Sequence, residues 1–143
     1  MNKIFLLLFV GFTCLFSACG GDDAPTPTPD VSKKQLISKA WRFISQKENG
    51  VETYINVPTC KADDLTIINQ DGTFQMTNGA TKCSPNDDQI IASATWVFLD
   101  NETKFRFLLD DAPIFTILEL SATKLKLSAT LDNDLVEWTY VPN

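Results

Sequence analysis

The side chains of this chain that could do chemistry are four cysteines and eighteen carboxylates, because its 143 residues contain no histidine. Without histidine the sequence excludes Ser-His-Asp and Cys-His catalytic sites and lacks the commonest metal ligand. Several carboxylates occur in pairs, which a two-carboxylate hydrolase would require. These pairs lie at predicted turns, where aspartate is favoured for backbone reasons: Asp63-Asp64, Asp87-Asp88, Asp110-Asp111 and Asp132/Asp134. We therefore expect no enzyme activity, no catalytic residues, no metal site and no cofactor.

The segment that precedes Cys19 has the three parts of a signal peptide. Lys3 gives a positive start, residues 4–16 are almost uninterruptedly apolar, and Ser17 and Ala18 are small. The apolar run of about 13 residues is too short to span a hydrocarbon core of roughly 30 Å as a helix. We therefore predict a signal peptide over residues 1–18, with cleavage between Ala18 and Cys19.

Cys19 is the predicted site of lipidation. Phe16-Ser17-Ala18-Cys19 resembles the bacterial lipobox, in which small residues precede a cysteine that is acylated, for example with palmitate, and becomes the new N-terminus. Two or three acyl chains anchor a protein stably where a single chain does not. The alternative is an ordinary signal peptide whose removal leaves a free thiol on Cys19. The lipobox predicts a lipid anchor. Gly20 follows Cys19 in place of the Asp that, by analogy with enteric bacteria, retains lipoproteins in the inner membrane, so we expect the anchor in the outer membrane, at the cell surface or on the periplasmic face.

Residues 19–32 are predicted to be a tether. Pro25, Pro27 and Pro29 alternate with other residues, which excludes helix and sheet ladders and favours extended polyproline II. The acidic pair Asp22-Asp23 resembles the tethers that direct Bacteroidetes-type lipoproteins to the cell surface. A linker that is merely soluble is the alternative.

Cys60 and Cys83 remain once Cys14 is removed with the leader and Cys19 carries lipid. In an oxidising compartment this even pair is predicted to form a disulfide. It would close a loop of about 24 residues and contribute on the order of 3 kcal/mol. A zinc site is disfavoured because two thiols do not fill a tetrahedral site. A redox pair is disfavoured because Cys-X-X-Cys is absent.

The elements that must position these residues are mostly strands. A short helix is expected over residues 31–39, capped by Ser32 with Leu36 and Ile37 facing inward. Asn49-Gly50, Asp71-Gly72 and Asn78-Gly79 favour tight hairpins. Four further turn signals follow at a spacing of about ten residues, which is typical of a meander. The strands are expected at 41–48, 51–57, 65–70, 73–77, 89–99, 103–109, 114–120, 123–130 and 135–141.

Strict alternation of apolar and polar residues along these strands predicts one buried and one solvated face, as Leu125, Leu127 and Ala129 illustrate. A sheet built only of hairpins avoids exposed edges most simply by closing into a barrel. We therefore predict an all-β fold: a small up-and-down antiparallel barrel of eight or nine strands over residues 33–143, preceded by the short helix.

The inward face is rich in aromatic side chains, and two interpretations of it remain open. Eight-stranded barrels are just wide enough for side chains to fill them, which favours a filled core. The alternative is an apolar pocket for a small ligand at the barrel mouth. The side chains concerned are Trp41, Phe43, Phe74, Trp96, Phe98, Phe105, Phe107 and Trp138.

The folded part resembles a known family. The run Trp41…Cys60-x-x-Asp63-Asp64…Asp71-Gly72-Thr73-Phe74…Gly79…Cys83…Trp96-x-Phe98…Leu120-Ser121-x-Thr123-x-Leu125 is similar to the lipocalin-like domain of Bacteroidetes lipoproteins. The resemblance covers residues 39–141. It implies a small barrel on a lipid anchor, in a family mostly of unknown activity.

These observations favour a tethered barrel that binds a small apolar ligand, with the membrane contacted through Cys19. The alternative is a structural or accessory protein with a filled barrel, whose partner is an envelope protein. The net charge of −6 and the absence of a Lys/Arg cluster make nucleic acid an unfavourable partner.

Overall fold

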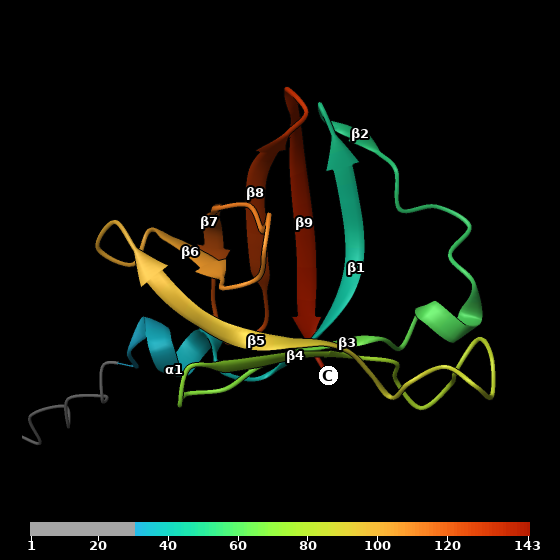
Figure 1. Cartoon of the computed structure of the whole chain (residues 1–143). Coiled ribbons are helices and arrows are strands. Elements are labelled where there is room, and N and C mark those ends of the chain that lie inside the picture. The colour runs from blue at the N-terminus through green and yellow to red at the C-terminus, as the bar shows by residue number, and fades with distance from the viewer. Residues whose placement is uncertain (1–30) are drawn as a thin grey trace, which may run out of the picture.

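The computed structural model describes residues 31–143, which form one nine-stranded antiparallel sheet and a short helix (Figure 1). The strand order is β2-β1-β3-β4-β5-β6-β7-β8-β9, and β1 also pairs with β9. All strands except β2 therefore close into an eight-stranded barrel, as predicted. The elements are α1 (Lys33–Ile37), β1 (Ala40–Glu48), β2 (Val51–Glu52), the 3-10 turn η1 (Thr59–Lys61), β3 (Leu65–Ile68), β4 (Thr73–Thr77), β5 (Ile90–Leu99), β6 (Lys104–Phe107), β7 (Phe115–Leu120), β8 (Leu125–Leu131) and β9 (Asp134–Pro142).

Each predicted strand is present, but the one expected over 51–57 is only two residues long. The carboxylate of Glu52 accepts hydrogen bonds from Ser45 Oγ at 2.6 Å and from the amides of Gln46 and Tyr54 at 3.1 and 3.2 Å. The amides of Gln46 and Tyr54 are therefore bonded to this carboxylate, whereas a longer β1–β2 ladder would pair such amides with backbone carbonyls. Asn56 then has a positive φ of 56°, which ends the extended conformation. The prediction was wrong here because the Glu52 side chain takes the Gln46 amide, and the amides of Thr53 and Tyr54 both donate to one carbonyl, that of Gln46, instead of continuing the ladder.

Most predicted turns are confirmed. Asn49-Gly50 joins β1 to β2 and Asp132-Asn133 joins β8 to β9, each with positive φ at both residues. Asn78-Gly79 is not a hairpin, because β4 ends at Thr77 and β5 begins only at Ile90. Gly79 is needed there for close approach, since a Cβ on it would overlap the backbone of Asp63.

The barrel is closed at the end where α1 lies. Ser32 caps this helix in a reciprocal capping box with Gln35, so the predicted cap is confirmed. Ile37 is fully buried, and its carbonyl accepts a hydrogen bond of 2.7 Å from Trp41 Nε1. Lys39 Nζ lies 5.1 Å from the centre of the Trp41 ring. The core at this end is completed by Ile68, Phe74, Trp96, Phe105, Leu125 and Leu127.

The described residues 31–143 form a closed sheet around this core. A segment with its own closed sheet and core has what an independently folding domain requires. Within this segment no helix is long and apolar enough to cross a membrane.

Candidate functional site

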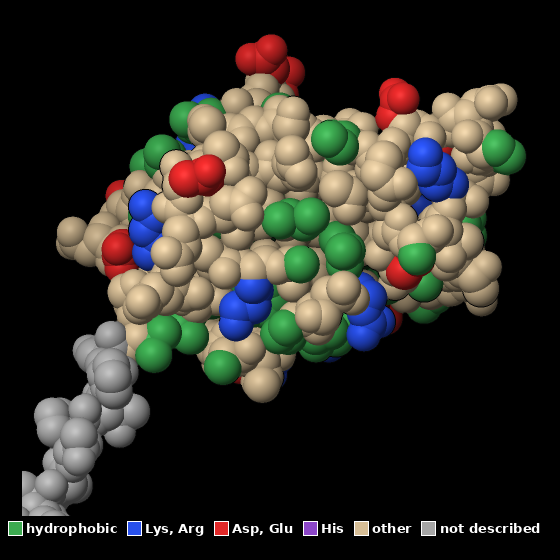
Figure 2. Space-filling view, turned by 90° about the horizontal axis from the view of Figure 1, so that it is seen from below, with side chains coloured by type: hydrophobic (Ala, Val, Ile, Leu, Met, Phe, Trp, Pro, Cys, Tyr) green, Lys and Arg blue, Asp and Glu red, His purple; other side chains and the backbone are tan. Residues whose placement is uncertain are grey.

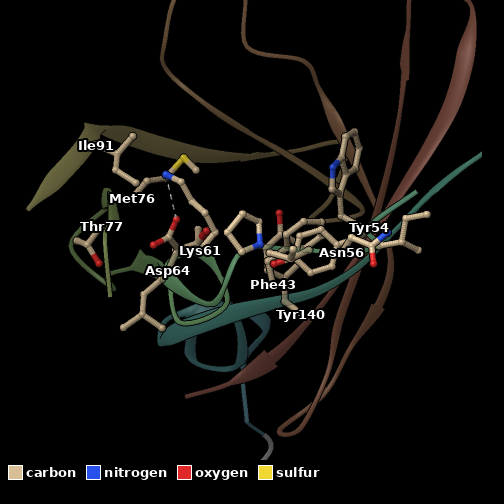
Figure 3. Close-up of a pocket in the computed structure, with 15 residues that line it drawn as sticks. Phe43, Tyr54, Asn56, Lys61, Asp64, Met76, Thr77, Ile91 and Tyr140 are labelled. Atoms are coloured by element: carbon tan, nitrogen blue, oxygen red, sulfur yellow. Dashed lines mark ion pairs between the residues drawn. The ribbon is translucent and has the colours of Figure 1, made fainter. Parts of the chain in front are cut away.

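The barrel end opposite α1 is hollow. Four connections surround it: residues 49–64, the loop 78–89, the loop 108–114 and the turn 132–133. One cavity of about 510 Å³ lies under residues 54–58 (Figure 3), and a second of about 370 Å³ lies beside the loop 108–114. Both are lined by Thr66, Met76, Trp138 and Tyr140. We call the two together the mouth cavity.

The register of the strands points these side chains inward. Thr66 pairs with Met76, and Phe43 pairs with Tyr140 across the β1–β9 seam. Directly paired residues share a face of the sheet, so each pair extends the inner surface that begins at the buried core. Met76 is 40% exposed although it faces inward, because the barrel is open at this level.

Aromatic rings form one wall of the mouth cavity. The Phe43 ring centre lies 4.2 Å from that of Tyr54 and 5.3 Å from that of Tyr140. Trp138 Nε1 donates a 3.0 Å hydrogen bond to Gln46 Oε1, which fixes the indole at the cavity. Burial raises the pKa of Tyr140, and burial followed by the charge of Asp64 raises the pKa of Tyr54. Both hydroxyls are therefore neutral at neutral pH and can donate hydrogen bonds.

The second cavity has an aromatic floor and an acidic rim. The Phe107 ring stacks on Phe74 at 3.8 Å and meets Phe115 edge-on at 5.8 Å. Asp110 and Asp111 line the cavity from the loop above. The mouth cavity is thus apolar in depth and polar at its edges.

A charged pair lies at the far side of the first cavity from the aromatic wall, next to Met76 and Ile91 (Figure 3). Lys61 Nζ is 3.7 Å from Asp64 Oδ2. Asp64 also accepts a hydrogen bond of 3.3 Å at Oδ1 from the amide of Gly79. The cavity therefore presents an ammonium group to any molecule that enters it.

The predicted disulfide is confirmed: Cys60 is bonded to Cys83, with their Cα atoms 5.0 Å apart. Cys60 lies in η1 and Cys83 in the loop 78–89. The bond therefore joins two of the segments that surround the mouth cavity. It fixes the backbone next to Lys61.

Three of the four carboxylate pairs have a member that is hydrogen-bonded within a turn or loop. Asp63 Oδ2 accepts from the amide of Thr81 at 3.0 Å, Asp87 from that of Ser84 at 2.8 Å, and Asp134 from Asn49 Nδ2 at 2.8 Å. These partners belong to the turns and loops, which is the structural role that the sequence indicated for these three pairs, whereas Asp110 and Asp111 line the mouth cavity. Across residues 31–143, no group of three or more His, Cys, Asp or Glu side chains could hold a metal ion.

The two interpretations of the inward aromatic face each describe one end of the barrel. Trp41 and Phe105 lie in the filled core, Phe43 and Trp138 line the mouth cavity, and Phe74 lies at the boundary between the two. Sequence reasoning missed Lys61 and Tyr54, which lie in the irregular stretch between β2 and β3. Tyr140 is two residues beyond the inward Trp138 in β9 and so shares its face, but this alternation does not indicate a cavity there.

The predicted signal peptide, Ala18, Cys19 and the tether up to Asp30 lie outside the described residues. On the face shown in Figure 2, the Lys and Arg side chains that are drawn lie scattered among acidic and hydrophobic ones rather than in one basic patch.

No protein-family model matches this chain, and no curated protein matches it in sequence.

Proposed function

We propose that this protein is an envelope-anchored lipoprotein whose lipocalin-like barrel binds a small apolar ligand in the mouth cavity. The observation that carries the binding role is the open, aromatic-walled cavity of about 510 Å³ opposite the filled end. Ligand sites in proteins are typically concave, about 300–1,000 Å³ in volume and mostly apolar, with a few polar groups. The role is binding rather than catalysis, because the chain has no histidine and Asp63, Asp87 and Asp134 are hydrogen-bonded within turns and loops.

Filling the cavity tests the binding role. Met76 lines both parts of the mouth cavity, so Met76→Trp should occupy space that a ligand would take. The segment 31–143 would be titrated with N-phenyl-1-naphthylamine, a neutral apolar dye whose fluorescence rises in apolar surroundings. We expect saturable binding by the unchanged protein and a loss of about tenfold or more in affinity for Met76→Trp, equivalent to roughly 1.4 kcal/mol.

Gln75→Trp is the matched control, because Gln75 is the neighbouring residue of β4 and points to the outer face. This variant should bind the dye like the unchanged protein. No saturable binding by the unchanged protein, or equal binding by Met76→Trp, would contradict the proposal.

The anchor is supported by the sequence Phe16-Ser17-Ala18-Cys19 and is tested by fractionation. In the full chain, Cys19→Ala should move the protein from the membrane fraction to the soluble fraction, while Cys14→Ala should not. A Cys19→Ala protein that still sediments with membranes after a high-salt wash would rule out the lipid anchor. Protease treatment of whole cells would distinguish the cell surface from the periplasmic face of the outer membrane.

The second candidate function is an accessory role in which the outer face of the barrel contacts an envelope protein. It is favoured by apolar side chains on outward positions, where Val97, Leu118 and Leu135 are 38%, 47% and 49% exposed. An empty mouth cavity in native mass spectrometry, together with one protein crosslinked reproducibly to this face, would favour this role over ligand binding.

A further inference from the structure

Lys61 is the only Lys or Arg side chain among the described residues that line the mouth cavity. Its ammonium group has three donors, and its one ion pair within residues 31–143 is the 3.7 Å contact with Asp64. The side chain is 47% exposed, and that of Asp64 is 24% exposed. Lys61 is therefore loosely held and has donors to spare.

Asp64, in contrast, already has a partner for each carboxylate oxygen, namely Lys61 Nζ and the amide of Gly79. Asp87 and Asp88 line a shallow cavity on the other side of Lys61 without forming an ion pair with it. The group that the first cavity offers to a ligand is thus a cation, and its complement is an anion.

The backbone that carries Lys61 is fixed. The Lys61 amide donates a 2.8 Å hydrogen bond to the carbonyl of Pro58, and the preceding residue is the disulfide-bonded Cys60. Figure 3 shows the side chain extending from this turn toward Met76 and Ile91, away from the aromatic wall. An anionic group bound there would leave the aromatic wall free for an apolar body.

The second cavity determines the orientation of a bound ligand. Asp110 and Asp111 at its rim would repel an anion, while Phe107 and Phe115 offer apolar contacts below them. The first and second cavities meet at Trp138 and Tyr140. A molecule that spans both would therefore place its charged end at Lys61 and its apolar end between the phenylalanines.

We infer that the mouth cavity binds an amphipathic carboxylate, with the carboxylate on Lys61 Nζ and the apolar chain along Tyr140 and Trp138 toward Phe115. This inference rests on the proposed function, the binding of an apolar ligand in the same cavity. It specifies that this ligand carries a carboxylate head group.

The experiment compares cis-parinaric acid with its methyl ester, two fluorescent polyenes that differ in the charge of the head group. Each is titrated into the segment 31–143 and into the variants Lys61→Met, Asp64→Asn and Lys124→Met. Lys124 is the matched control, because it is a similarly exposed lysine whose ion pair with Glu119 lies near the closed end. Thermal melts of each variant establish that it is folded.

The acid should bind the unchanged protein about tenfold more tightly than the ester, as expected for a hydrogen bond to a charged group. Lys61→Met should lose about that factor for the acid and keep its affinity for the ester. Asp64→Asn should bind the acid at least as tightly as the unchanged protein, and Lys124→Met should bind both probes unchanged.

Equal affinities for acid and ester, or a Lys61→Met variant that binds the acid unchanged, would overturn the inference and leave apolar binding intact. Weaker acid binding by Asp64→Asn would also overturn it, because the ion pair rather than the cation would then matter. If neither probe binds, and the neutral dye does not bind either, the proposed function fails and the inference fails with it.

Discussion

Each tryptophan side chain of this barrel is held by one hydrogen bond from its indole N–H. All three tryptophans face inward, and each indole N–H has an acceptor. Trp41 donates to the carbonyl of Ile37 at 2.7 Å, Trp96 to that of Asn69 at 3.0 Å, and Trp138 to the side chain of Gln46 at 3.0 Å. Buried indoles usually need such a partner. The backbone acceptors belong to the closed end and the side-chain acceptor to the mouth cavity.

The Glu52 side chain makes the stability of the cavity wall around Tyr54 depend on pH. The hydrogen bond from Ser45 holds the pKa of Glu52 below its usual value near 4.5, and bonds from the amides of Gln46 and Tyr54 act in the same direction. An acid whose pKa is lowered by folding stabilises the folded state above its unfolded pKa. This contribution is lost as the pH falls below about 4.5 and through the folded pKa.

We therefore expect the amides of Thr53 and Tyr54, which both donate to the carbonyl of Gln46, to lose protection from hydrogen exchange in acid. In Glu52→Gln the protection should be lower at pH 7 and should vary little with pH. Glu102→Gln, at an exposed turn of the closed end, should behave like the unchanged protein. Protection in Glu52→Gln that equals that of the unchanged protein at pH 7 would contradict this role.

At the scale of elements, α1 acts as the plug of the barrel although it is only five residues long. A helix this short has little stability of its own. It is held by the capping box at Ser32, by the burial of Ile37 and by the hydrogen bond from Trp41. Its stability therefore comes from the barrel that it closes.

Ile37→Ala should lower the free energy of unfolding by about 2–5 kcal/mol, because it removes a fully buried side chain and leaves a cavity in the core. Leu36→Ala should cost less, because Leu36 is only partly buried. Urea denaturation of the segment 31–143 would measure both. Equal costs for the two variants would show that α1 does not pack through Ile37 in solution.

The regular elements could be predicted from the sequence because their causes are local. The alternation of Leu125, Leu127 and Ala129 fixes the inner face of β8, and Asp132-Asn133 has the residue types that a two-residue turn requires. The strand over 51–57 was predicted too long because Glu52 binds β1 through its side chain. No local pattern reports such a contact.

The mouth cavity could be predicted only in part. The inward aromatic residues suggested either a filled core or a pocket, and the choice between them depends on where the strands end relative to the core. Lys61 reaches the cavity through a turn whose position is fixed by Cys83, more than twenty residues away in sequence. Contacts between irregular loops leave no periodic signal.

At the scale of the whole molecule, the disulfide couples stability to the shape of the mouth cavity. The bond closes a loop of about 24 residues and contributes on the order of 3 kcal/mol in the chain-entropy model. Reduction of the segment 31–143 should therefore lower its melting temperature by about 10 °C or more.

Calorimetry with and without dithiothreitol would measure this shift. The double variant Cys60→Ser/Cys83→Ser should melt at the lower temperature under both conditions. Because the bond holds the turn next to Lys61, reduction should also weaken binding of cis-parinaric acid at a temperature where the barrel is still folded. An unchanged melting temperature after full reduction would contradict the stabilising role.

The two ends of the described chain meet at the same pole of the barrel. The chain enters through α1, and it leaves where Trp41 pairs with Pro142 and the amide of Asn143 donates to the carbonyl of Ala40. Both ends of the described chain are therefore points for attaching a reporter protein on the side opposite the opening. If the protein is anchored through Cys19 as proposed, the first described residue follows the tether at the pole of the barrel farthest from the opening.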